Sequence, residues 1–175
     1  MHPIIYDVAV SLDGYISGKD GDISKFAHDG PVVEDYMSRM AGYATAVMGR
    51  ATYEFGYRFG LEPGQNPYPH MTTIVLSNTF QNPENSSVSA WASADAERIR
   101  SLKKTASGPI YLCGGGALAG WMLEEGLIDG VILKRAPCLY GEGVSLFGNR
   151  QGLPALSRIK TKTYDNGYLL EEFLI

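Results

Sequence analysis

The chain has 175 residues, of which 45% are hydrophobic and 11% aromatic, and its formal net charge is -4. This composition excludes a disordered chain and is typical of one globular domain, so we expect a single domain over residues 1–175. No run of lysine or arginine occurs, which argues against nucleic-acid binding and favours a small-molecule ligand. No apolar run has membrane-spanning length, and two cysteines are too few for a disulfide framework. We therefore expect a cytoplasmic protein with no membrane partner.

The first half of the chain alternates strand and helix patterns. Residues 4–11, "IIYDVAVS", are typical of a buried strand, and apolar residues at helical spacing predict a helix over 32–40. The short apolar run 44–49 predicts a second strand, and residues 50–59 could hold a short helix. The β-branched segment 72–78 predicts a third strand.

The second half continues this alternation and then changes. A helix is expected over 93–106, followed by strand, helix and strand over 109–113, 117–126 and 128–137. The C-terminal residues alternate in hydropathy around Asn166-Gly167, a strong hairpin signal. We therefore predict a three-layer α/β domain, whose mainly parallel sheet carries a C-terminal antiparallel hairpin at one edge.

Four polar or glycine-rich motifs each follow a predicted strand. They are "SLDGYISG" at 11–18, "VMGRATYE" at 47–54, "VLSN" at 75–78 and "CGGGALAG" at 113–120. Parallel sheets bind ligands beyond the carboxyl ends of their strands. We therefore expect the four motifs to meet on one rim of the sheet.

Each motif alone allows a structural and a ligand-binding interpretation. The triplet Gly114–Gly116 lacks the spacing of the dinucleotide fingerprint and of the P-loop, so it serves either a tight turn or a close approach of backbone to a phosphate. Arg50 could bind a phosphate or be solvated, and Thr52 could face a pyrophosphate or cap a helix. Ser77 and Asn78 commonly form turns. Because these groups converge on one rim, we favour a nucleotide-phosphate site.

Taken in order, five segments resemble the dihydrofolate reductase-like family: "VAVSLDGYISG", "VMGRATYE", "IVLSN", "IYLCGGGALAGWMLEEGLIDGVIL" and "PCLYGEGVSLFG". The resemblance covers nearly the whole chain. It is closest to the branch that contains the C-terminal reductase domain of the bifunctional riboflavin-biosynthesis deaminase-reductase. It implies the fold of that family and NADPH as the cofactor, with a hydride passing from the nicotinamide to a bound heterocycle.

The resemblance also implies which residues hold the cofactor. Those implied are Ala9 and Ile16 beside the nicotinamide, then Gly49, Arg50, Thr52, Leu76, Ser77, Asn78, Cys113, Gly114, Gly115, Gly116, Ala117 and Leu118 along the phosphates and adenosine. Neither "MGRAT" nor "VLSN" contains an acidic residue that would bind bare ribose hydroxyls, which favours NADPH over NADH.

Candidates for the chemistry are fewer. Dihydrofolate reductases place an acidic residue on the first helix, which makes Asp35 the candidate proton donor, while a solvated carboxylate is the alternative. Asp13 is expected to hold its loop by local hydrogen bonds. Lys134 and Arg135 interrupt an apolar strand on opposite faces, so one of them could meet an anionic substrate group or an interface. No histidine or cysteine spacing indicates a metal site.

The leading hypothesis is an NADPH-dependent reductase of a small pterin-, pyrimidine- or flavin-like heterocycle. Authentic dihydrofolate reduction and a non-catalytic nucleotide-binding protein are the alternatives, because Cys113 stands where the riboflavin branch usually has a substrate-binding glutamate. The exposed edge of the terminal hairpin, or the aromatic segment 53–59, would suit a homodimer contact.

Overall fold

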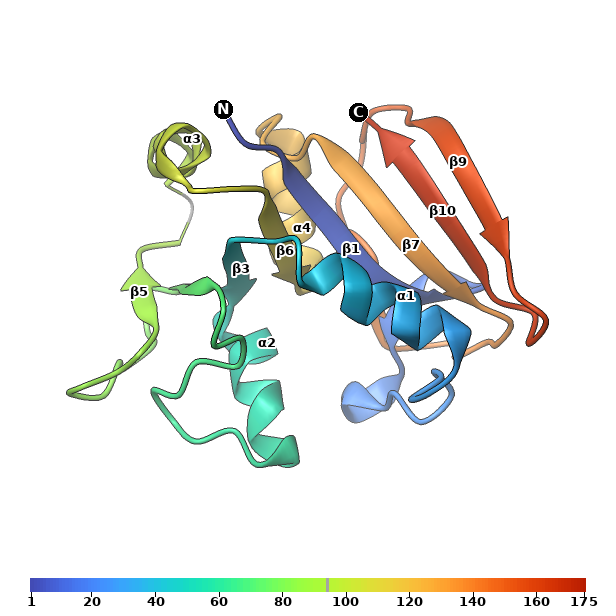
Figure 1. The fold of residues 1–175 in the computed structure, drawn as a ribbon, viewed down its shortest axis with the longest axis horizontal. Helices are drawn as coiled ribbons and strands as arrows, with labels where there is room; N and C mark the ends of the chain where they lie inside the picture. Colours follow the sequence, from blue (N-terminus) through green and yellow to red (C-terminus); the bar gives the residue numbers. More distant parts are fainter. Residues whose placement is uncertain (94) are drawn as a thin grey trace.

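A central sheet organises the molecule, and the computed structural model describes residues 1–93 and 95–175 of it. The strands of this sheet are β1 Ile4–Ser11, β3 Thr45–Gly49, β4 Thr72–Leu76, β5 Ser89–Trp91, β6 Ile110–Gly114, β7 Gly130–Ala136, β9 Ser157–Thr163 and β10 Leu169–Leu174. Their order across the sheet is β5-β4-β3-β6-β1-β7-β10-β9 (Figure 1). Strands β5 to β7 in this order run parallel, and β10 pairs antiparallel with both β7 and β9.

Helices cover both faces of this sheet. They are α1 Pro31–Met40, α2 Arg50–Phe55, α3 Ala96–Thr105 and α4 Gly116–Glu124, with the 3-10 turns η1 Lys19–Gly21 and η2 Gly56–Phe59. Apolar residues of α3 and α4 share one core with Ile4 and Tyr6 of β1. Residues of α1 and α2 pack on the opposite face, where Tyr53 of α2 is buried. The predicted three-layer α/β sheet with a C-terminal hairpin is therefore confirmed.

The predicted elements agree with the observed ones apart from their ends and three short strands. The helix expected over 93–106 begins at Ala96, where the Asp95 carboxylate accepts a hydrogen bond from the Arg98 N–H; residue 94 lies outside the described residues. Strands β5, β2 Tyr15–Ser17 and β8 Val144–Ser145 were not predicted. These strands have two or three residues, too few to show a hydropathy period, so tertiary pairing alone defines them.

Alternation along β1 directs side chains to the two faces and thereby prepares the site. Tyr6 points toward the core beneath α4, whereas Asp7 points toward α1, where it meets Arg39. Lys134 of β7 lies on that same face as Asp7, since Val131 and Leu133 pack into the opposite core. One face of the sheet therefore carries charge beside α1.

The terminal hairpin closes one edge of the sheet, as predicted, and leaves β9 as the outer strand. Every residue of β9 is exposed, so this edge is free within the described chain, and a homodimer through it stays a prediction. Of the helices that the structure describes, none combines the length and apolar character that crossing a membrane requires.

Candidate functional site

Three adjoining cavities follow the carboxyl ends of the parallel strands. The loop cavity, of about 460 Å³, is lined by Arg50, Thr52, Gly115 and Gly116 among others. The middle cavity, of about 330 Å³, shares Thr52 and Gly115 with it. The inner cavity, of about 500 Å³, lies under α1 and shares Ile16 and Cys113 with the middle one. Because neighbouring cavities share walls, they form one cleft with two ends.

The loop cavity brings together most of the residues that the sequence assigned to the cofactor. Its predicted members are Gly49, Arg50, Thr52, Leu76, Gly115, Gly116, Ala117 and Leu118. Ala9 and Ile16 line the inner cavity instead, and Cys113 lies where the middle and inner cavities meet. Ser93, Trp121 and Arg150 also line the loop cavity and were missed, because nothing in their local sequence marks them.

The three consecutive glycines differ in what the structure requires of them. Gly114 has φ of +114°, a conformation that favours glycine, and it precedes a cis peptide bond. Gly116 packs so closely on the end of β8 that a Cβ there would overlap the backbone oxygen of Ser145. Gly115 has neither constraint: its φ is -80°, and a Cβ would meet only the Thr52 hydroxyl, at 3.2 Å. A turn thus explains Gly114 and a close contact within the protein explains Gly116, while a close approach of backbone to a phosphate stays a prediction for Gly115.

Polar side chains gather at the ends of β3 and β4. The Arg50 guanidinium donates to the Thr79 hydroxyl over 3.0 Å, and this hydroxyl lies 3.4 Å from that of Ser77. Glu54 is the nearest carboxylate, 3.7 Å from Arg50, one helical turn further along α2. Asn78 is turned away: its side-chain oxygen accepts from the Ser93 N–H over 3.1 Å and holds the turn. Arg50 and Ser77 thus lie close together through Thr79, which was not predicted. The Ser77 hydroxyl also accepts from the backbone N–H groups of Thr79 and Phe80, so it forms the turn that was its alternative role.

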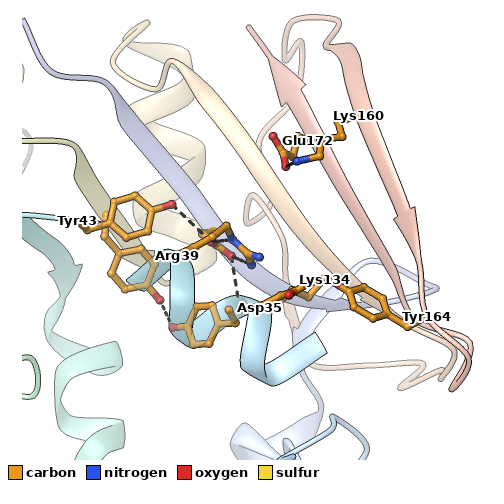
Figure 2. Close-up of polar contacts among 10 residues, drawn as sticks. Asp35, Arg39, Tyr43, Lys134, Lys160, Tyr164 and Glu172 are labelled. Carbon is orange, nitrogen blue, oxygen red and sulfur yellow. Dashed lines mark hydrogen bonds and ion pairs between the residues drawn. The ribbon is translucent and has the colours of Figure 1, made fainter. Parts of the chain in front are cut away.

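A buried carboxylate lies at the wall of the inner cavity. Arg39 of α1 binds Asp7 with two hydrogen bonds, of 2.8 and 3.2 Å, and the Tyr43 hydroxyl lies 3.4 Å away (Figure 2). Lys134 Nζ is 3.5 Å from Asp7 and 3.2 Å from the centre of the Tyr36 ring. Burial lowers the pKa of Lys134 to about 8, although Asp7 acts in the opposite direction. Two cations therefore share one carboxylate at this wall.

Tyrosine hydroxyls complete the inner cavity. The hydroxyls of Tyr36 and Tyr111 are 2.9 Å apart, and that of Tyr68 lies 3.6 Å from Cys113 Sγ. Burial raises the pKa of all three tyrosines well above the usual range, and it raises the pKa of Cys113 as well. These groups are therefore uncharged at neutral pH and act as hydrogen-bonding groups.

Comparison with known proteins assigns the chain to a family. The model of the RibD C-terminal domain matches residues 3–170, almost the whole chain. The chain belongs to this family. A Bacillus subtilis relative, YwjB, is 30% identical over 146 residues and is covered to 79% of its length, while 80% of this chain is matched.

Solved structures agree with that assignment of this RibD-type domain. A structure from Shewanella sp. PV-4, described as a riboflavin biosynthesis protein, is 26% identical with a TM-score of 0.81, covering 99% of this chain and 98% of that one. Enterococcus faecalis dihydrofolate reductase, solved with NADP(H), has a TM-score of 0.69 at 16% identity, covering 98% of this chain and 95% of the other. At that identity the second match shows the shared fold alone.

The RibD-type domain places Asp35, the predicted proton donor, on the side of α1 that faces β9. Its carboxylate accepts a hydrogen bond of 2.6 Å from the hydroxyl of Tyr164, which Figure 2 shows beside α1. It accepts a second hydrogen bond from Lys162 of β9. The bonds from Lys162 and Tyr164 lower the pKa of Asp35 below its ordinary value. A carboxylate in these contacts stays ionised, so its surroundings do not support the predicted role as an acid.

Asp13 holds its loop, as expected from the Asp-Gly pair. The carboxylate accepts from the Ser11 hydroxyl and from the backbone N–H groups of Tyr140 and Gly141, the last at 2.7 Å. The bond from Ser11 contributes most to lowering the pKa of Asp13. The loop after β1 is thereby tied to the segment after β7, which lets Ile16 form one wall of the cleft.

Proposed function

We propose that this RibD-type domain is an NADPH-dependent reductase of a small pyrimidine- or pterin-like heterocycle. One observation carries the proposal: a single cleft joins the loop cavity, which is lined by Arg50 and the backbone of Gly115 and Gly116, to a second end under α1. A dinucleotide needs such a path, because its adenosine and nicotinamide ends lie far apart and the nicotinamide must meet the substrate. The family and its members' reductase fold support the same reading.

The loop cavity fits the phosphate-bearing end of a dinucleotide. Gly115 leaves open the space that a side chain would occupy, so backbone there is free to approach a pyrophosphate at the start of α4. Arg50, Ser77 and Thr79 supply one cation and two hydroxyls within a few ångströms of one another. Such a group suits the extra phosphate that distinguishes NADPH from NADH. These residues would hold the adenosine end.

The middle and inner cavities fit the reacting end. The bound cofactor would supply a hydride to the substrate, and the chain would supply position and a closed, mostly apolar surround. Ile16 and Cys113 form the walls where the two cavities meet, and Ala9 lines the inner cavity. The tyrosine hydroxyls and Lys134 would orient a polar ring beyond them.

Direct binding tests the proposal. Trp121 lines the loop cavity, so NADPH should quench its fluorescence and show energy transfer, whereas NADH should bind more weakly. Oxidation of NADPH is then followed by absorbance with a panel of pterins, pyrimidines, flavins and quinones. Binding with turnover supports the reductase; binding without turnover on any of them would favour a non-catalytic nucleotide-binding protein. Failure to bind either cofactor would overturn the proposal.

Authentic dihydrofolate reduction is the weaker enzymatic alternative. Among the described residues that line the inner cavity, Asp7 is the one carboxylate, and Arg39 already binds both of its oxygens. A pterin that presents amino and ring N–H donors would find no free carboxylate there. Dihydrofolate belongs in the panel above as the substrate expected to react least.

A further inference from the structure

A fourth, smaller cavity lies beneath α2, beside the cleft. This side cavity has a volume of about 190 Å³, and residues from β3, α2 and the connection before β4 form its walls: Met48, Tyr53, Gly56, Leu61 and Pro67. Each residue that lines it is buried or half-buried. The inner cavity differs, because the exposed side chains of His28 and Met37 form part of its rim. The side cavity is therefore screened from solvent better than the inner one.

Cys113 joins the side cavity to the cleft. This residue and Phe55 line the side, middle and inner cavities alike. Thr52 is shared with the middle cavity, and Tyr68 is shared with the inner one. Because these walls are common, a ring placed where the middle and inner cavities meet lies at the entrance to the side cavity. The side cavity is thus a branch of the cleft at its proposed reacting end.

The walls of the side cavity are uncharged. Of the described residues that line it, none is acidic or basic. The Tyr53 hydroxyl donates to the Gln65 backbone oxygen over 2.8 Å, so its hydrogen is already used. The Tyr68 hydroxyl lies 3.6 Å from Cys113 Sγ, and burial raises the pKa of both groups. Since a neutral thiol packs like a small apolar group, the side cavity favours an apolar occupant.

An apolar cavity of this size is costly when it is empty. The side chains around it lose packing contacts, which a larger residue at Met48 or Leu61 would restore. An apolar cavity of about 150 Å³ in a protein core stays dry and binds benzene. The side cavity has a comparable volume and an uncharged lining, and it adjoins a cleft that suits a ligand. An apolar group of a ligand would restore the missing contacts.

We propose that the side cavity binds an uncharged apolar substituent of the substrate, from a methyl group to a phenyl ring in size. This inference rests on the proposed function and deepens it, because it adds a second recognition element to the ring held in the cleft. The substituent lies between Met48 and Leu61 while the ring stays beside Cys113. A carboxylate or phosphate is rejected, because it would lose its hydration without gaining a charged partner.

Benzene and benzoate test the side cavity without cofactor or turnover. Methionine methyl groups, labelled with an NMR-active isotope, report where each ligand binds. Met48 lines the side cavity, Met37 lines the inner cavity, and Met122 is buried in the core on the opposite face of the sheet. Benzene should shift the Met48 signal and leave the Met122 signal unchanged. Benzoate at the same concentration should leave the Met48 signal unchanged.

Two substitutions at one position change the side cavity in opposite directions. Leu61→Phe adds volume to the wall and should weaken benzene binding by roughly tenfold or more, because the space for the ring is filled. Leu61→Ala enlarges the same wall and should still bind benzene. Ile159→Phe is the matched control: it adds the same ring on the exposed strand β9, away from the four cavities, and should leave benzene affinity unchanged. Circular dichroism establishes that each variant is folded.

Turnover connects the side cavity to the proposed reductase. Each ring that is reduced with NADPH is compared with its phenyl-substituted and carboxyl-substituted forms. Leu61→Phe should raise KM for the phenyl-substituted form and leave kcat nearly unchanged, because the substituent binds away from the reacting atoms. The unsubstituted ring should be reduced equally well by the variant and the unaltered protein.

Three results would overturn the inference: a Met48 signal that benzene does not shift, a Met48 signal that benzoate shifts as much as benzene does, or unchanged benzene affinity in folded Leu61→Phe. Each of these leaves the reductase proposal intact if NADPH still binds. Conversely, absence of NADPH binding would remove the proposed reductase, while the benzene titrations would still report on the side cavity. The two failures are therefore distinguishable.

Discussion

The two ends of the cleft are built from different materials. The loop cavity consists of backbone turns and small polar side chains at strand ends, and glycines set its shape. The inner cavity consists of side chains from the middle of β1, β7 and α1, and a charge cluster sets its character. The shape of the loop cavity depends on steric fit. The charge of the inner cavity depends on which of its groups are protonated. Substitutions at the first end should therefore act at any pH, and those at the second should depend on pH.

The largest effect should come from the glycine that supports the fold. Gly116→Ala should lower the free energy of unfolding by about 3 kcal/mol, because its methyl group overlaps the Ser145 backbone oxygen and the end of β8 must move. Gly115→Ala is the matched control: it should change stability by less than about 1 kcal/mol, since only the Thr52 hydroxyl has to yield. Urea unfolding measures both.

The NADPH affinity of these two variants should separate a glycine that serves the cofactor from one that serves the fold. Folded Gly115→Ala should bind NADPH more weakly than the unaltered protein, because the methyl group occupies the space left for the pyrophosphate. A Gly115→Ala variant that is unstable yet binds NADPH normally would mean that this glycine serves the turn. Equal stability of Gly116→Ala and the unaltered protein would show that the Ser145 segment is not held against α4.

The next effect concerns the cofactor phosphate. Arg50→Ala should weaken NADPH by roughly tenfold to a hundredfold, the worth of a hydrogen bond to a charged group, and should leave NADH almost unchanged. Thr79→Val removes the hydroxyl that holds the guanidinium and should reproduce part of this loss. Fluorescence titration of both cofactors measures the difference. Equal weakening of NADPH and NADH would place Arg50 on the shared pyrophosphate instead.

At the inner end, the cost of burying Lys134 should appear in stability. Its folded pKa of about 8 lies below the ordinary value of 10.5, so the charged form is disfavoured in the fold. That cost is present in full below pH 8 and is relieved as the pH rises from 8 toward 10.5, where the folded chain binds fewer protons than the unfolded one. Lys134→Met should therefore raise the free energy of unfolding by about 1 kcal/mol at neutral pH.

Thermal midpoints measured between pH 8 and pH 10 test the direction of this effect on stability. The advantage of Lys134→Met over the unaltered protein should shrink as the pH rises from 8 to 10. A constant difference would mean that the variant acts through packing, and a loss of stability at neutral pH would mean that Asp7 depends on Lys134 as well as on Arg39.

The sequence could predict the loop end of the cleft better than the inner end. At the loop end, Arg50, Ser77 and the glycines sit in short motifs after strands and could be located from local pattern. The groups that lie outside these motifs could not: Thr79, Ser93, Trp121 and Arg150. Asn78 shares the motif but supports its turn, because one bond rotation decides whether an amide faces the cleft. Local pattern thus locates a motif and does not determine the direction of each side chain.

At the inner end, the contacts join residues far apart in the chain. Asp7 is a charged residue within an apolar strand, and that pattern marks it as unusual. Its partner Arg39 lies 32 residues away, and no local pattern indicates that the two residues pair. Lys134 was marked as an interruption of its strand, but only the register that pairs it with Ala9 places it beside Asp7. Neither Tyr68 nor Tyr111 was predicted, because a buried tyrosine has the same pattern in a core and in a cavity wall.

The smallest effect should come from the acid that the sequence favoured. Asp35→Asn should leave turnover and its pH profile nearly unchanged, because Lys162 and Tyr164 occupy the carboxylate and hold its pKa low. It should cause a small loss of stability above the pKa of an unfolded aspartate, and that loss should vanish in acid, where the folded carboxyl is also protonated. Lys162→Met, which removes the partner and keeps the carboxylate, should give a similar small loss. A turnover rate that collapses in Asp35→Asn but not in Lys162→Met would restore Asp35 as the proton donor.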